Sequence, residues 1–175
     1  MVQEHREAWA RRVVTGVDSQ GRSTFVSDGL TETRRVTDAF TLNHLWQAIS
    51  VPIHVGADNT LGKEAVIPPP RAGFTYMITT MPPDHEWDFE AGYAKALADS
   101  HAEESVVTSD IAGLHATDTV DIITIISGEV WAVTETGEKL LKPRDTIVQR
   151  GTRHAWRNRG TVPCEMVVVH FGGVR

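Results

Sequence analysis

From Leu114 onward, short runs of strand-favouring residues alternate with pairs of turn-forming residues. The separators, such as Ser127-Gly128 and Thr136-Gly137, contain glycine, proline or aspartate. Many short strands at close turn spacing are typical of β-sandwiches and barrels. The expected strands are residues 115–126, 129–134, 139–141, 146–149, 154–157 and 163–171. The pattern predicts an all-β fold for this part of the chain.

The N-terminal part of the chain has a sparser pattern. Residues 10–15 and 22–26 flank a Gly- and Asp-containing turn and predict a hairpin. Residues 74–81 predict a further strand, which ends before Pro82-Pro83 because proline cannot donate to a sheet ladder. The path of residues 30–70 stays open at this level.

Residues 88–100 are expected to form one short helix. Apolar side chains recur there at helical spacing, at Phe89, Tyr93, Ala96 and Leu97, and Asp88 is a suitable N-cap. We therefore expect residues 1–112 to form an N-terminal β arm, extra strands and this inserted helix. They would pack on a core formed by residues 113–175, within one structural domain.

Composition excludes several classes of protein. The chain has 175 residues, 41% of them hydrophobic, which is enough for one core. Its 17 basic and 23 acidic residues give a formal net charge of −6, which argues against a nucleic-acid partner. Cys164 is the single cysteine, so no intramolecular disulfide can form.

Targeting and cofactor motifs are missing from the sequence. No apolar run approaches the roughly 20 residues that span a bilayer, so we expect no membrane partner. The charged N-terminus has no apolar signal segment, which predicts a cytoplasmic protein. The phosphate-binding glycine motifs are missing, so no nucleotide cofactor is expected, and there is no serine-nucleophile elbow.

The residues that can carry chemistry begin at His115. In a strand, His115, Thr117, Thr119 and Asp121 would share one face. A flat strand would hold His115 and Asp121 about 20 Å apart. The two side chains can approach a common ion only if the chain bends or turns between them.

These residues resemble the first motif of the cupin superfamily. That motif has two histidines one residue apart, a glutamate three or four residues later, and a glycine six residues after it. In this chain His115 stands at the first histidine, Thr117 at the second, Asp121 at the glutamate and Gly128 at the glycine. Two departures are therefore present, threonine for histidine and aspartate for glutamate.

A second segment resembles the other cupin motif. Gly151, His154 and Asn158 match its glycine, histidine and asparagine in spacing, while Arg144-Asp145 replaces its Gly-Asp. The resemblance is closest in the segment Gln-Arg-Gly-Thr-Arg-His-Ala-Trp at residues 149–156. It covers about a third of the chain well.

The resemblance implies a double-stranded β-helix, also called a jelly-roll barrel, with the motif side chains inside. His115, Asp121 and His154 would hold one divalent transition metal, Fe, Mn, Ni or Zn. A pocket around that ion would be lined by Thr117, Thr119, Trp131 and Trp156. The implied function is an enzyme acting on a small organic metabolite, of dioxygenase, decarboxylase, isomerase or dehydratase type.

Three alternatives stay open. The pocket histidines could act as acid and base without a metal. The barrel could bind a small molecule without turnover, or serve only in assembly. In each case the resemblance implies a homodimer formed through the N-terminal strands. His170, beside Phe171 on the last expected strand, is interpreted as a core or surface histidine rather than a ligand.

Overall fold

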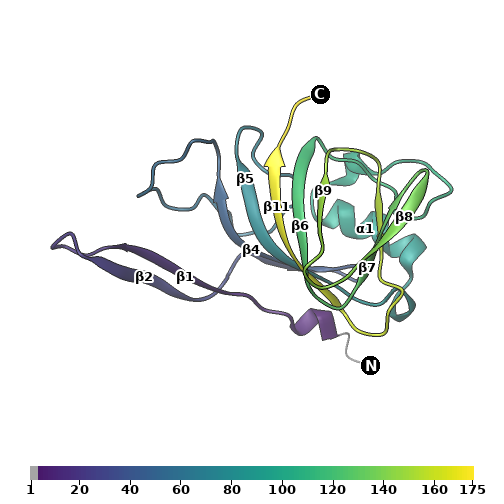
Figure 1. The fold of residues 1–175 in the computed structure, drawn as a ribbon, viewed down its shortest axis with the longest axis horizontal. Coiled ribbons are helices and arrows are strands. Elements are labelled where there is room, and N and C mark those ends of the chain that lie inside the picture. The colour runs from purple at the N-terminus through teal and green to yellow at the C-terminus, as the bar shows by residue number, and fades with distance from the viewer. Residues whose placement is uncertain (1–3) are drawn as a thin grey trace.

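Strands dominate the computed structural model, which describes residues 4–175 (Figure 1). The strands are β1 Arg11–Val17, β2 Ser23–Leu30, β3 Arg34–Val36, β4 Thr41–Ala48, β5 Phe74–Met81, β6 Thr119–Ser127, β7 Val130–Thr134, β8 Gly137–Leu141, β9 Thr146–Gln149, β10 Ala155–Arg157 and β11 Cys164–Gly172. The helices are α1 Phe89–Asp99 and the short 3₁₀ turns η1 Glu4–Glu7, η2 Asp84–Glu86 and η3 Glu103–Ser105.

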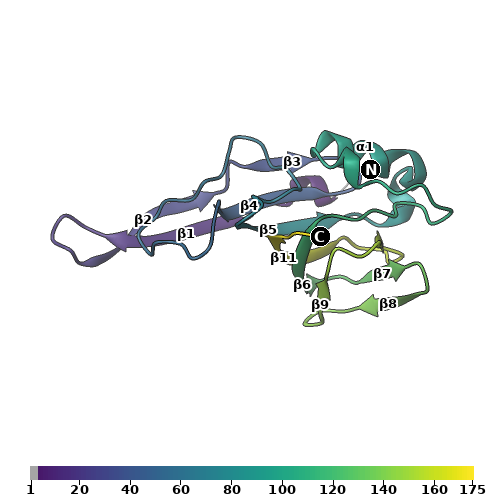
Figure 2. The ribbon, with the colours of Figure 1, turned by 90° about the horizontal axis from the view of Figure 1, so that it is seen from above.

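Two antiparallel sheets build the barrel. The larger has the strand order β3-β4-β5-β11-β6-β9, and the smaller has the order β10-β7-β8. Figure 2 shows β7 and β8 in a layer on the opposite side of the molecule from β3 and β4. The all-β, jelly-roll type of fold predicted from the sequence is confirmed.

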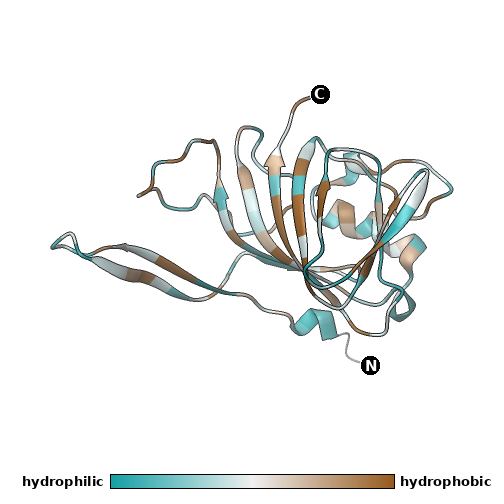
Figure 3. Cartoon of the chain, in the orientation of Figure 1, coloured by the Kyte–Doolittle hydropathy of each residue, from teal (hydrophilic) through white to brown (hydrophobic). Residues whose placement is uncertain are grey.

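The core lies between the sheets and beneath α1. Met77 and Val168 from the large sheet pack in one cluster with Val130 from the small sheet and Leu97 from α1. Apolar residues alternate along the barrel strands, as Figure 3 shows, because successive side chains of a strand point to opposite faces. The core therefore draws on both the N-terminal and the C-terminal parts of the chain.

The inserted helix forms where the sequence predicts it. Asp88 caps α1 by accepting a hydrogen bond from the Ala91 amide at 3.1 Å. The four apolar residues at helical spacing, Phe89, Tyr93, Ala96 and Leu97, are the buried ones. This helix thus covers one end of the barrel with its apolar face.

The hairpin β1–β2 extends away from the barrel (Figures 1 and 2). β2 continues to Leu30 rather than ending near Val26, because the pairing with β1 runs on to Arg11 opposite Leu30. Every residue of β2 is exposed. The arm is therefore a two-stranded ribbon with little support from the core.

The run of residues 115–126 is not one continuous strand, which corrects the sequence-based expectation. β6 begins only at Thr119, and the backbone bends at Asp118. His115 instead forms an isolated bridge with His154. Residues 115–118 therefore lie outside the β6 ladder. The chain bends there, as it must if His115 and Asp121 are to approach each other.

No helix in the described part of the chain, residues 4–175, is long and apolar enough to cross a bilayer.

Candidate functional site in the barrel

A cavity of about 80 Å³ lies inside the barrel. Most of its wall is apolar and comes from β4, β5, β6, β11 and α1. The apolar residues include Leu42, Met77, Leu97, Ile123, Met166 and Val168. Its polar side chains include His115, Thr117, Asp121, His154 and His170, together with Thr79. The cavity is therefore an apolar pocket that contains a small group of titratable residues.

His115 and His154 are neighbours because their backbones pair. The amide of each donates to the carbonyl oxygen of the other, both at 2.9 Å. Their rings lie 4.3 Å apart between centroids, and the ring of Tyr93 lies 5.7 Å from that of His115. The two motif segments thus bring their histidines together from distant parts of the sequence.

Backbone carbonyls fix the orientation of both rings. Nδ1 of His115 lies 2.9 Å from the oxygen of Gly113, and Nδ1 of His154 lies 2.9 Å from the oxygen of Thr152. A carbonyl only accepts, so each Nδ1 must carry the proton. The Nε2 atom of each neutral ring then keeps its lone pair, which is the form that binds a metal or accepts a proton.

Burial keeps these rings neutral. It lowers the pKa of His115 to about 3, with a further contribution from the nearby His154 ring. Burial also lowers the pKa of His154, partly opposed by its hydrogen bond to the Thr152 carbonyl and by the charge of Asp121. At neutral pH both imidazoles are therefore lone-pair donors rather than cations.

Asp121 is a buried carboxylate whose oxygens are not all hydrogen-bonded. It lies on β6 opposite His170 of β11 and Gln149 of β9. Its Oδ1 atom is buried without a hydrogen-bond partner. Its Oδ2 atom lies 3.9 Å from Nε2 of His170. An unpaired buried charge is costly, so this oxygen is a place where a cation or a hydrogen-bond donor would be stabilising.

Only two of the four predicted pocket-lining residues line the cavity. Thr117 and Trp156 line the cavity. Thr119 is buried and its hydroxyl lies 2.7 Å from that of Thr117, so these hydroxyls bond to each other. Trp131 lies on the opposite face of β7 from the buried Val130 and Ala132, and Arg159 stacks 4.9 Å from its ring centroid.

The donor types fit a divalent metal, although the donor groups are spread. Among residues 4–175, no three His, Cys, Asp or Glu side chains are grouped closely enough to form a ready metal site. His115, His154 and Asp121 nevertheless line one cavity, and Oδ1 of Asp121 has no hydrogen-bond partner. Imidazole and carboxylate donors suit Fe, Mn, Ni or Zn. His115, Asp121 and His154 are the residues that would hold the ion.

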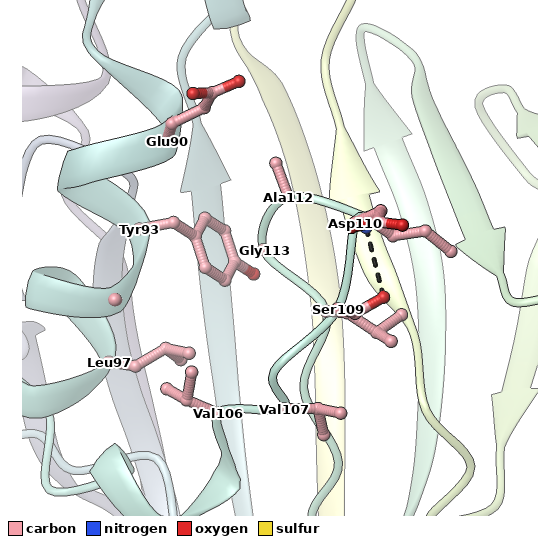
Figure 4. A pocket seen from close by; sticks show the side chains of 12 residues that line it. Glu90, Tyr93, Leu97, Val106, Val107, Ser109, Asp110, Ala112 and Gly113 are labelled. Carbon is pink, nitrogen blue, oxygen red and sulfur yellow. Dashed lines mark hydrogen bonds between the residues drawn. The ribbon is translucent and has the colours of Figure 1, made fainter.

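A larger hollow of about 340 Å³ lies outside the cavity, between α1 and residues 106–114. In Figure 4, Tyr93 and Leu97 project from α1 toward the segment that carries Val106 and Gly113. Tyr93 and Leu97 line the inner cavity as well as this hollow. These two side chains therefore separate the hollow from the histidine-lined cavity.

The positions of the two motifs decide the fold family. His115 from the first motif pairs with His154 from the second, and Asp121 faces the same cavity inside a β-barrel. The chain folds as a jelly-roll barrel, in which the two segments that resemble the cupin motifs lie side by side. The substitutions at Thr117 and Asp121 leave that architecture intact.

Known proteins resemble this chain over a limited stretch of sequence. No family model matches the chain. "Phomopsin biosynthesis cluster protein C'" of Diaporthe leptostromiformis is 45% identical over 47 residues, which are 26% of this chain and 25% of that protein. "Oryzines biosynthesis cluster protein J" of Aspergillus oryzae is 53% identical over 45 residues, 25% of each chain. The chain thus spans about a quarter of the length of these curated relatives.

Solved cupin structures are similar over more of the chain at low identity. A Cupin 2 conserved barrel domain protein from Salinispora arenicola CNS-205 is 13% identical and has a TM-score of 0.44, covering 79% of this chain and 81% of its own. Ectoine synthase from P. lautus is 13% identical with a TM-score of 0.46, covering 82% of this chain and 72% of its own.

Sequence reasoning missed His170 as a cavity residue. Met166, Val168 and His170 alternate on β11, and all three line the cavity. That alternation was readable in the sequence. The choice of the inner face was not, because it depends on the partner strands of β11.

Proposed function

We propose that this cupin is an enzyme that converts a small organic metabolite with the help of one divalent transition metal. His115, Asp121 and His154 would hold the metal. The observation that carries the proposal is the unpartnered Oδ1 of buried Asp121 in a cavity that also contains two neutral histidines. Hydrogen-bond acceptors without matching donors favour a bound cation.

The surrounding residues would prepare the site in two ways. The carbonyls of Gly113 and Thr152 hold the imidazoles with Nε2 free, which is how ligating histidines are commonly oriented. Apolar neighbours such as Ile123 and Val168 keep bulk water out. A bound metal of this kind supplies Lewis acidity and lowers the pKa of a coordinated water.

The size of the cavity limits what can react there. About 10–15 Å³ of such space holds one water molecule, so the cavity of about 80 Å³ has room for a small group of atoms rather than for a whole large metabolite. We infer that the reacting end of the substrate enters the cavity and that its remainder lies in the hollow between α1 and residues 106–114. Tyr93 and Leu97 would have to move aside to let it pass.

The curated relatives support a metabolite as substrate. Their names place them in biosynthesis clusters for phomopsin and the oryzines. The barrel fold hosts several types of chemistry, and the proposal concerns metal-assisted conversion rather than one named reaction.

Metal content tests this proposal directly. Tag-free protein should contain nearly one equivalent of a transition metal by elemental analysis, after reconstitution under anaerobic conditions if necessary. His154→Ala should lose it, whereas His101→Ala, on an exposed side chain, should retain it. Wild-type protein without metal after reconstitution would refute the metal site.

A metal-free binding module is the second candidate. The contact between the His115 and His154 rings favours it, since two neutral imidazoles can serve a ligand as hydrogen-bond acceptors or as acid and base. In that case candidate metabolites should raise the melting temperature of the metal-free protein. His154→Ala should abolish the shift.

A further inference from the structure

His170 completes the polar end of the cavity from a strand outside both motifs. It lies on β11, where it pairs with Asp121 of β6. Its Nδ1 atom lies 3.3 Å from the carbonyl oxygen of Ile67. As for His115 and His154, a carbonyl partner at Nδ1 places the lone pair of a neutral ring on Nε2. A backbone carbonyl at Nδ1 therefore orients the ring of each of the three histidines.

The distance between His170 and Asp121 suits a shared ion better than a direct contact. Nε2 and Oδ2 are 3.9 Å apart, which is longer than a hydrogen bond. Two donor atoms that bind one ion at about 2.1 Å each cannot lie more than about 4.2 Å apart. The observed separation of this pair lies within that limit. Among residues 4–175 no three such donors are grouped closely enough to hold an ion as they stand, so binding would draw the side chains together.

Thr117 is poorly placed for the role that the second motif histidine has in the family. A neutral hydroxyl is a weak ligand for Fe, Ni or Zn beside imidazole. The Thr117 hydroxyl is also bonded to that of Thr119. A fourth donor must therefore come from elsewhere, and His170 is the remaining histidine that lines the cavity.

We propose that His170 is the fourth donor of the metal site and replaces the motif histidine that Thr117 lacks. This inference rests on the proposed function, because it needs the ion held by His115, Asp121 and His154. The site would then contain three imidazoles and one carboxylate, with one donor supplied by the last strand.

The test measures metal affinity and ligand field rather than turnover. Metal-free protein is titrated with Zn²⁺ against a chromophoric chelator, and with Co²⁺ while its visible absorption bands are recorded. We expect His170→Ala to weaken Zn²⁺ binding at least about tenfold and to change the Co²⁺ bands. Added imidazole should partly restore the wild-type bands by filling the space left in this variant.

Three further variants make the result decisive. His44→Ala is the control, because His44 is a buried histidine of the same sheet that does not line the cavity; it should keep the wild-type affinity. His154→Ala should lose binding. His170→Leu fills the same space without a donor atom and should weaken Zn²⁺ binding as His170→Ala does. It serves as the test if His170→Ala is unstable.

The outcomes separate the two proposals. If the wild type binds metal and His154→Ala does not, while both His170 variants bind like the wild type, His170 is not a ligand and the metal function stands. If the wild type binds no metal, both the metal function and this inference are overturned.

Discussion

Single buried polar side chains fix the segments around the cavity. Asn158 of the second motif is completely buried. Its Nδ2 donates to the carbonyls of Met81 and Val162 at 3.1 and 2.9 Å, and its Oδ1 accepts from the Gly160 amide at 3.0 Å. This residue therefore ties the turn after β10 to the end of β5 and does not act in the cavity.

Asn158→Ala should be strongly destabilising. It removes three hydrogen bonds and leaves buried carbonyls unpaired, which predicts a loss of about 3 kcal/mol in the free energy of unfolding. Urea denaturation measures this value. Asn59→Ala is the control: its side chain accepts a hydrogen bond from the Leu61 amide in a loop at the surface, and the loss there should stay below about 1 kcal/mol. Equal losses in both variants would contradict the argument.

His44 makes stability depend on pH. Burial, with smaller effects of His170 and Arg35, lowers its pKa to about 4. The unfolded chain protonates His44 near pH 6.5, so between pH 6.5 and 4 the unfolded state binds more protons than the folded state. Stability contributed by neutral His44 is therefore present above pH 6.5 and is lost as the pH falls to 4, by up to about 3 kcal/mol.

Thermal melts of metal-free protein at pH 7 and pH 4.5 test this dependence. The wild type should melt at a lower temperature at pH 4.5. His44→Asn should show a smaller difference between the two pH values, although it is less stable at both. A difference as large as that of the wild type would show that other groups cause the acid sensitivity.

At the scale of elements, the turns hold the sheets in register. Gly128 stands in the turn between β6 and β7 with φ of +67°. An added Cβ there would lie 2.4 Å from the carbonyl oxygen of Pro163 and 2.9 Å from the Cα of Cys164. The motif glycine is thus required both by backbone conformation and by the close approach of the chain entering β11.

Gly128→Ala should lower the free energy of unfolding by more than about 2 kcal/mol. Alanine is strained at a positive φ, and its Cβ would clash with the backbone of the chain entering β11. The matched control is Gly137→Ala at the first residue of β8, where an added Cβ meets nothing within 4 Å. That variant should change the free energy of unfolding by less than about 1 kcal/mol. Chemical denaturation of both proteins compares them.

At the scale of the whole molecule, the β1–β2 arm stands apart from the core. Val17, Phe25, Val26 and Leu30 are 68%, 72%, 57% and 58% exposed. An isolated two-stranded hairpin is marginally stable in water, and its open edges favour pairing with another chain. We expect a second copy of this chain to cover the arm, giving the homodimer implied by the family resemblance.

Light scattering coupled to size-exclusion chromatography tests the dimer. Wild-type protein should have twice the mass of the chain, and Phe25→Asp should shift it toward the monomer, because a buried unpaired carboxylate is costly. Val174→Asp, at a comparably exposed position near the C-terminus, should leave the dimer intact. A monomeric wild type would contradict the expectation.

The sequence by itself determined the local features of this protein. Runs of strand-favouring residues between turn formers predicted β5 and β9 with their observed bounds, helical spacing predicted the buried face of α1, and motif spacing pointed to His115, Asp121 and His154. These features are readable because each depends on residues that are close in the chain.

Only the tertiary structure decided how those elements meet. The bridge between His115 and His154 goes with a β6 that begins only at Thr119, and the side of β7 that faces the core placed Trp131 outside the cavity. The register of β11 against β6 set His170 opposite Asp121. A shift of one residue would turn each side chain to the other face, and that register is fixed by packing between distant segments rather than by any local pattern.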